Sequence, residues 1–248
     1  MKRREFLVAG ATATLLTSTN IGSTAAPASI FVDGNHFSTH ALSTRADKLT
    51  PPAEGSIPVA FAISMGATMI DFAGPWEVFQ DVMLKGPTGH RSGFNLYTVS
   101  EKTEPIEASA GMKIVPDYTF ETAPAPKVVV IPAQSGSKAL HAWLRKVVDS
   151  TDVTMSVCTG AFQLGKAGLL SGKEATTHHE FFEQFAKAFP DVKLKRGLRF
   201  VENERISTAG GLTSGIDLAL RVVERYFGRE TAEQTAVYME YQSRGWIV

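Results

Sequence analysis

The sequence predicts an α/β fold, a doubly wound and mostly parallel sheet with helices on both faces. Apolar runs that suit strands buried on both faces alternate with helical patterns through most of 57–248. One of these runs, 153–157, stops at Cys158, the only cysteine, and a helical pattern begins directly after it. At 248 residues the chain is long enough for one such domain and a tail.

The composition excludes several kinds of site. Lys and Arg together number 25, as do Asp and Glu, so the net charge suggests neither a nucleic-acid partner nor an anionic membrane surface. A single cysteine excludes an internal disulfide and a cysteine-rich metal site.

The first 28 residues have the layout of an export signal. Arg3 and Arg4 lie in a basic start and are followed by Glu5-Phe6-Leu7, a pattern that resembles the twin-arginine type. A weakly apolar run at 8–16 is too short to span a bilayer, and 26–28 (Ala-Pro-Ala) offers a cleavage site. We therefore expect a periplasmic or otherwise exported protein without stable membrane insertion. The alternative for 1–28 is a disordered basic tail.

Residues 29–56 are rich in Ser, Thr, Gly and Pro, which predicts a linker or surface arm and leaves 57–248 as the folded domain. His36 and His40 lie four residues apart in this arm. Because no helical pattern brings them onto one face, we interpret them as solvated histidines rather than metal ligands.

The domain begins with an apolar run at 57–64, which predicts a buried strand. Asp71 stands between this strand and a predicted helix, in an apolar neighbourhood. The apolar positions of that helix are Trp76, Val78, Phe79 and Val82. Two interpretations of Asp71 stay open. It caps the helix, or it places a carboxyl group at the C-terminal edge of the sheet, where open α/β sheets bind ligands.

Two further parallel strands are predicted at 94–99 and 127–133, with a hairpin or extended arm at 105–116 between them. The strand at 127–133 runs into the turn 134–137, whose N–H groups could face a ligand. Ser137 is in position to cap a helix that extends through Asp149.

The turn at Cys158 has the spacing of a nucleophile elbow. Small residues flank it, Ser156 before and Gly160 after, as a sharp strand-to-helix turn requires. The N–H groups at the start of the following helix, which we expect to end at 171–173, would favour the thiolate. The alternative is a buried free cysteine at the end of a core strand.

Beyond the elbow, residues 176–180 lead into a helix whose phenylalanines indicate core packing. Two short strands are predicted within 198–206. Gly210 and Gly211 precede a helix that extends through Phe227, which is a weak signal for an anion site because the Walker spacing and its lysine are absent. A last helix is expected over about 231–242.

Several blocks, in order along the chain, resemble the ThiJ/PfpI (DJ-one) superfamily. They are Asp71-Phe72-Ala73-Gly74-Pro75, Val129-Val130-Ile131-Pro132, Ser156-Val157-Cys158-Thr159-Gly160-Ala161, Ala175-Thr176-Thr177-His178 and 208–217. The resemblance covers about 57–241 and implies a flavodoxin-like fold of the class I glutamine amidotransferase type. The Ser-Val-Cys-Thr-Gly block joined to Gly-Gly-x-Thr-x-Gly-Ile-Asp is most similar to the branch that holds isonitrile hydratase and the N-terminal domains of AraC-type regulators.

The resemblance implies roles for individual residues. Cys158 matches the family's nucleophile, Asp71 the carboxyl group that faces it, and Thr159 the next residue, whose N–H would be one oxyanion donor. Thr159 also stands where the protease-like members have His, which argues against a peptidase. His178 fills a family position that is either a pocket residue or structural.

The remaining substrate or oxyanion contacts are expected from Gly160 and from the turn at Ala133 and Gln134. The family commonly reads Ile-Pro-Gly-Gly at this turn. If the backbone there needs a positive φ, Ala and Gln are poor substitutes for Gly, so we expect a reshaped pocket.

We therefore expect an enzyme without cofactor or metal, a hydratase or hydrolase that acts on a small electrophile such as an isonitrile, nitrile, carbonyl or aldehyde. Cys158 would attack, and Asp71, whose pKa its apolar neighbours raise, would hold or relay the proton. An enzyme or sensor thiol should react with iodoacetamide well below pH 8. The alternative is a periplasmic small-molecule binder, a thiol redox sensor or a stress protein without turnover.

The expected partners are a small-molecule substrate and a second copy of the chain, because members of the superfamily usually dimerise. No nucleic-acid partner is expected, since no helix-turn-helix pattern follows the last predicted helix.

Overall fold

The computed structural model describes residues 46–86 and 89–248. The predicted export signal at 1–28 and the first part of the predicted arm, 29–45 with His36 and His40, lie outside the described residues.

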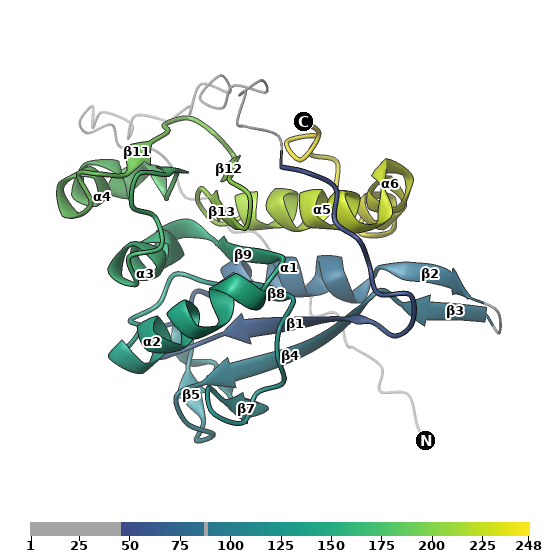
Figure 1. Ribbon diagram of the computed structural model, residues 1–248, viewed down its shortest axis with the longest axis horizontal. Coiled ribbons are helices and arrows are strands. Elements are labelled where there is room, and N and C mark those ends of the chain that lie inside the picture. The colour runs from purple at the N-terminus through teal and green to yellow at the C-terminus, as the bar shows by residue number, and fades with distance from the viewer. Residues whose placement is uncertain (1–45, 87–88) are drawn as a thin grey trace, which may run out of the picture. The chain divides into compact units, whose positions relative to one another are not determined.

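A seven-stranded sheet forms the centre of the domain, in the order β12-β13-β9-β8-β1-β4-β7 (Figure 1). Its strands are β1 (Ile57–Ala62), β4 (Phe94–Ser100), β7 (Tyr118–Thr119), β8 (Val128–Ile131), β9 (Val153–Ser156), β12 (Phe200–Glu202) and β13 (Ile206–Ala209). Neighbouring strands are parallel, except that β12 is antiparallel to β13. All residues of β8 and β9 are buried, as expected of strands covered on both faces.

Helices cover both faces of this sheet. Successive side chains of β1 point to opposite faces, so they alternate between two hydrophobic cores. Val59 and Phe61 lie in the core formed with α1 (Met69–Gln80), α5 (Ser214–Phe227) and α6 (Arg229–Tyr238). Ala60 and Ala62 lie in the other core, formed with α2 (Lys138–Val147), α3 (Ala161–Lys166) and α4 (Phe182–Ala188). The predicted doubly wound, mostly parallel fold is confirmed.

Within the described residues, three small strand pairs lie outside the central sheet. The hairpin predicted at 105–116 is confirmed as β5 (Ile106–Glu107) and β6 (Lys113–Ile114). Two pairs are additions to the prediction: the hairpin of β2 (Met83–Gly86) and β3 (Gly89–Ser92), and the parallel pair β10 (Glu174–Ala175) and β11 (Lys193–Leu194). The described residues of β2 and β3 are exposed or half-buried, so they carry no apolar signal.

The helix ends agree only in part with the prediction. The Ser137 side chain caps α2 by accepting a hydrogen bond from Leu140 N at 3.1 Å, as predicted. The predicted end of α3 at 171–173 is wrong, since α3 ends at Lys166 and Gly168 then takes a φ of +77°, which a right-handed helix excludes. Similarly, α6 ends at Tyr238 rather than at 242.

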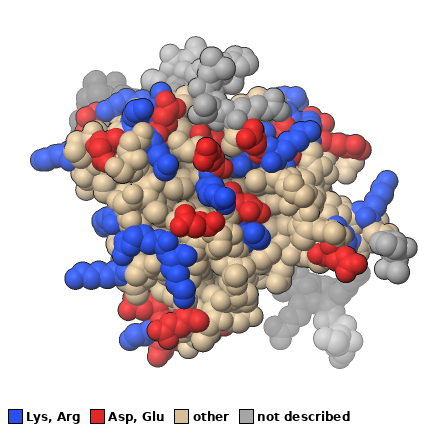
Figure 2. Space-filling model, in the orientation of Figure 1, with Lys and Arg blue, Asp and Glu red and all other residues tan. Residues whose placement is uncertain are grey.

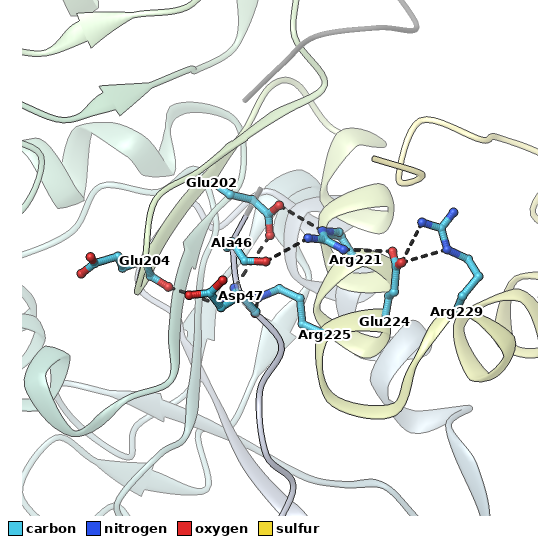
Figure 3. A network of polar contacts seen from close by, with 8 residues as sticks. All are labelled: Ala46, Asp47, Glu202, Glu204, Arg221, Glu224, Arg225 and Arg229. Atoms are coloured by element: carbon cyan, nitrogen blue, oxygen red, sulfur yellow. Dashed lines mark hydrogen bonds and ion pairs between the residues drawn. The ribbon is translucent and has the colours of Figure 1, made fainter. Parts of the chain in front are cut away.

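A buried ion-pair network joins α5 to β12 (Figure 3). Glu202 of β12 is fully buried and accepts a hydrogen bond from Arg221 Nε at 3.0 Å. Glu224 lies between Arg221 and Arg229, at N–O distances of 3.1 and 2.7 Å. Charges buried this deeply lose their hydration, so they are stable only when they are paired.

The chain before β1 supplies further acceptors to this network (Figure 3). Arg221 Nη2 donates to Ala46 O at 3.2 Å and Arg225 Nε donates to Asp47 O at 2.9 Å. Leu49 N donates to Arg225 O at 2.8 Å. The described end of the predicted arm, 46–49, therefore lies along α5.

On the face of the molecule drawn in Figure 2, basic and acidic side chains are interspersed. Among the helices of the described residues, none is both long enough and apolar enough to cross a bilayer.

Candidate active site

Cys158 occupies a strained turn between β9 and α3. Its φ of +57° is left-handed, a region that residues other than glycine rarely adopt. A 3-10 turn at Cys158–Gly160 leads directly into α3, and Cys158 is only 7% exposed. This is the geometry of a nucleophile elbow at the C-terminal edge of a parallel sheet.

Gly160 makes this sharp turn possible. A Cβ at Gly160 would lie 2.2 Å from Ile131 O and 2.9 Å from Pro132 O, so only glycine fits where the turn crosses the end of β8. The Gly160 N–H donates to Val157 O at 2.9 Å. This N–H is therefore used inside the turn and is not a free oxyanion donor.

Asp71 lies in the first turn of α1 and is fully buried. The capping interpretation of Asp71 is wrong, because the N-cap of α1 is Thr68 and the Asp71 carboxyl group instead accepts a hydrogen bond from Ala133 N, at 3.1 Å through Oδ2. The Cys158 thiol lies beside the same carboxyl group and lowers its pKa. Oδ1 makes no hydrogen bond to the described residues.

Burial dominates the electrostatics of this pair. It raises the pKa of Asp71 to about 7, against the lowering effects of the Ala133 N–H and the Cys158 thiol. Burial, followed by the charge of Asp71, raises the pKa of the Cys158 thiol to about 11. Between these two values the pair carries one proton and one negative charge. The expected rise in the pKa of Asp71 is confirmed. The N–H groups that were expected to favour the thiolate do lower the pKa of the Cys158 thiol, but burial outweighs them.

Hydrogen-bond donors nevertheless converge on the sulfur. The N–H and the side-chain hydroxyl of Thr159 and the N–H of Leu212 each lower the pKa of the Cys158 thiol. Donors of this kind stabilise a negative charge on sulfur. The surroundings therefore suit a sulfur that becomes charged while it reacts rather than at rest.

The turn after β8 holds Asp71 in place. Ala133 N is used by Asp71. The Gln134 side chain turns inward, where Nε2 donates to Ala62 O at 2.8 Å and Oε1 accepts from Ser64 Oγ at 2.9 Å. The carbonyl oxygen of Gln134 accepts from Gln163 Nε2 of α3 at 2.9 Å. These polar groups of Ala133 and Gln134 join β1, the turn and α3.

His178 lies against the loop that precedes α5. A Cβ at Gly211 would lie 2.3 Å from Cδ2 of the His178 ring, so the ring fills the space beside this glycine. The ring stacks on His179 with centroids 4.5 Å apart, and burial lowers the pKa of His178. These contacts favour the structural interpretation of His178 over the pocket interpretation.

Two residues that the sequence did not single out contact Cys158. Thr177 Oγ1 is buried and donates to Cys158 O at 2.9 Å. The Leu212 N–H faces the sulfur, and Leu212 has a left-handed φ of +51°. Thr177 lies in the Ala-Thr-Thr-His block of the family resemblance, which was a usable signal, but a positive φ at a leucine has no signature in the sequence.

The described residues contain no cluster of three or more His, Cys, Asp and Glu side chains that could hold a metal ion. The weak anion-site signal after Gly210 also fails. The N–H groups of Ser214, Gly215 and Ile216 donate to the carbonyl oxygens of residues 211–213, within the first turn of α5.

Several proteins of known sequence or structure are similar to this chain. Isonitrile hydratase from Pseudomonas putida is 28% identical over 192 residues, which cover 75% of this chain and 79% of that protein. The HTH-type transcriptional regulator CdhR from Pseudomonas aeruginosa is 31% identical over 153 residues, which cover 59% of this chain and 45% of the regulator. The chain thus spans about half the length of that regulator.

A solved structure of a THiJ/PfpI family protein from Pseudomonas syringae is similar to this chain with a TM-score of 0.67 and 28% identity, over 77% of this chain and 78% of that one. The model of the DJ-1/PfpI family matches residues 58–225, which include Asp71, Cys158 and the loop before α5. The chain therefore belongs to the DJ-1/PfpI family.

Proposed function

We propose that this protein is a cofactor-free cysteine enzyme that adds water to a small electrophile. The preferred substrate class is an isonitrile. Cys158 is the nucleophile and Asp71 its acid and base. The observation that carries this proposal is the fully buried Asp71 carboxyl group, held by Ala133 N at 3.1 Å and facing the thiol. Similarity to isonitrile hydratase over 75% of the chain supports the substrate class.

The single proton of the pair suits this chemistry. As the sulfur bonds to the isonitrile carbon, Asp71 takes the thiol proton and delivers it to the same carbon, which gives a thioimidate on Cys158. Water then adds to that carbon, and its two protons go to the nitrogen and, as the carbon–sulfur bond breaks, to the sulfur. The product is the N-substituted formamide, so isonitrile and water balance without an oxidant or a reductant.

The site restricts the substrate by size and charge. Cys158 is 7% exposed and Asp71 is fully buried, so a small molecule must present the reactive carbon. Above pH of about 7 the negative charge of the pair repels an anionic substrate. We therefore expect small uncharged electrophiles rather than carboxylates or peptides.

Ligand binding without turnover is the second candidate function. Two similar proteins, CdhR and GbdR from Pseudomonas aeruginosa, are transcriptional regulators, although this chain covers only 45% and 55% of their lengths. A thiol pKa of about 11 also suits a site that binds without reacting. In that case a ligand would stabilise the wild type and Cys158→Ala equally and would remain unchanged.

We further propose that residues 1–28 direct export by the twin-arginine route, that 29–56 connect this signal to the domain, and that the mature protein is a periplasmic homodimer. Sedimentation velocity of the purified protein tests the oligomeric state, and a monomer at micromolar concentration would contradict the dimer.

A substrate screen tests the proposed activity. Wild type and Cys158→Ala are each incubated with isonitriles, nitriles, small aldehydes and glyoxals, and products are identified by mass spectrometry. We expect formamide from an isonitrile with the wild type alone. Turnover that survives in Cys158→Ala contradicts the mechanism, and binding without product in both proteins favours the second candidate.

A further inference from the structure

We propose that Gln163 of α3 is a positioning residue that fixes the Asp71 carboxyl group relative to the Cys158 thiol, and that His141 of α2 orients the Gln163 amide. Neither the sequence motifs nor the resemblance assigns a role to Gln163 or His141. The inference rests on the proposed function only for its catalytic consequence, because the contacts themselves require no substrate.

Gln163 places a polar side chain in the core, on the helix that follows the elbow. It is 2% exposed, and the other buried residues of this helix, Ala161 and Leu164, are apolar. A buried amide is stable only where its hydrogen bonds are made within the protein. The partners of this amide therefore show why a polar residue lies there.

Both ends of the Gln163 amide have partners. Nε2 donates to Gln134 O at 2.9 Å and to Ser135 O at 3.4 Å, both in the turn after β8. Only the N–H end of an amide can bind two carbonyl oxygens, so Oε1 is an acceptor. Its donor is Nε2 of His141, at 2.8 Å, which fixes the proton of the neutral imidazole on that nitrogen. Gln163 thus joins the turn to α2 and α3.

Gly136 leaves the space that this amide occupies. A Cβ at Gly136 would lie 2.1 Å from Oε1 of Gln163 and 2.6 Å from its Cδ. The φ of Gly136 is +68°, a conformation that favours glycine. The amide therefore packs directly against the backbone of the turn, and a shift of one displaces the other.

The same turn holds Asp71. Ala133 N donates to Asp71 Oδ2 at 3.1 Å, and Ala133 O accepts from Thr68 N at 2.9 Å, so one end of the turn is fixed to the start of α1. Gln163 holds the next residues of the turn from α3, the helix that begins at the elbow of Cys158. It therefore connects the segment that carries the thiol to the segment that supports the carboxyl group.

Loss of this connection should displace the turn without unfolding it. Gln134 Nε2 still donates to Ala62 O at 2.8 Å, and Gly136 N still donates to Ser64 Oγ at 3.0 Å. These hydrogen bonds fix the turn to β1 and the residues after it, but they do not involve α3. The role of Gln163 is thus specific to the spacing between the turn and the elbow.

Gln163→Met tests the inference in the full chain, because it keeps the length of the side chain and removes every hydrogen bond of the amide. The pKa of Asp71 is measured by NMR titration of protein with isotopically labelled aspartate carboxyl groups, and the Asp71 signal is the one that Asp71→Asn lacks. The Ala133 N–H and the Cys158 thiol both lower the pKa of Asp71, so displacement of the turn should raise that pKa by about one unit. An equal or lower Asp71 pKa overturns the proposal.

Lys166→Met is the matched control, since Lys166 is exposed on the same helix. The Asp71 pKa of this control should equal that of the wild type. An equal rise in both variants would mean that any change in α3 moves the turn, and the proposal would be wrong.

His141→Ala tests the second part of the proposal and decides the first part if Gln163→Met does not fold. Without this donor the Gln163 amide loses its fixed orientation, so the Asp71 pKa should rise, by less than in Gln163→Met. Gln163→Met/His141→Ala should match Gln163→Met, because His141 acts only through the amide. An unchanged Asp71 pKa in His141→Ala, or additive shifts in the double variant, overturns the proposal.

None of these titrations needs a substrate, so the inference and the proposed activity can fail separately. Where a substrate is turned over, the pH at which kcat/KM falls should move upward with the Asp71 pKa in Gln163→Met. A pH profile that stays at the wild-type position would contradict the positioning role.

Discussion

The backbone N–H of Ala133 donates to Oδ2 of Asp71 at 3.1 Å and so joins the turn after β8 to the first turn of α1. This contact holds a fully buried carboxyl group next to the only cysteine of the chain. The elbow carries Thr159 after the nucleophile, so the thiol is paired with a carboxyl group rather than with a neighbouring histidine. The chemistry of the site depends on how these two groups share a proton.

Replacement of Asp71 by asparagine should lower the pKa of the Cys158 thiol from its value of about 11. After burial, the charge of Asp71 is the largest cause of the raised thiol pKa, and asparagine removes the charge but keeps an oxygen for Ala133 N. Alkylation by iodoacetamide below the thiol pKa should therefore be faster in Asp71→Asn, by about tenfold for each unit by which that pKa falls.

Glu77→Gln is the matched control for this variant, since Glu77 is an exposed carboxylate on the same helix. Its thiol should alkylate as in the wild type. A thiol pKa in Asp71→Asn that equals or exceeds the wild-type value would show that the two groups do not interact.

Turnover should fall as the pH is lowered through about 7. Asp71 must be ionised to accept the thiol proton, and its pKa of about 7 means that the carboxylate is lost below that pH. The measurement is kcat/KM against pH between about 5 and 9. A rate that is constant across pH 7, or that rises on acidification, would mean that the protonated carboxyl group is the active form.

The sequence predicted the central sheet well because its strands are buried on both faces and form continuous apolar runs. The exposed strands β2 and β3 carry no such signal, and the end of α3 depends on the backbone conformation of Gly168. The exposed strands and the end of this helix depend on solvent exposure and local backbone conformation, which the pattern of apolar residues does not predict.

For the site, the sequence indicated which side chains would lie close together but not which backbone groups would stay free. Asp71, Cys158 and Thr159 meet as expected. Ala133 and Gly160 were expected as oxyanion donors, and both N–H groups are taken by partners within the protein. Whether a backbone N–H already has a partner depends on tertiary contacts, and so does the left-handed backbone conformation of Leu212.

Glu202→Gln should destabilise the fold strongly. Glu202 is fully buried and accepts a hydrogen bond from Arg221 Nε at 3.0 Å. Its Oε1 also lies 3.8 Å from Arg225 Nη1. Removal of one charge from a buried network typically costs about 3–5 kcal/mol, because the partner charge is left uncompensated. Urea denaturation of the full chain measures the loss.

Glu204→Gln is the control for this change. The Glu204 side chain is exposed, and only its backbone carbonyl oxygen contacts Arg225. Its free energy of unfolding should stay within about 0.5 kcal/mol of the wild type. Equal effects of the two substitutions would remove the structural role assigned to the buried network.

Arg3→Lys/Arg4→Lys should abolish export if 1–28 is a twin-arginine signal, because the export machinery recognises the arginine pair. Cell fractionation followed by immunoblotting measures the change, with Lys2→Arg as a conservative control that leaves the pair intact. Periplasmic accumulation of the double variant at the wild-type level would rule out this route.

The proposed covalent step is tested most directly by the intact mass of the protein after rapid acid quenching of a reaction with a small isonitrile. With Cys158 as the nucleophile and Asp71 as the proton carrier, wild type should gain the mass of one isonitrile on Cys158, Asp71→Asn should form this adduct more slowly, and Cys158→Ala should form none. Formamide production by Cys158→Ala at the wild-type rate, or an adduct on any residue other than Cys158, would contradict the mechanism.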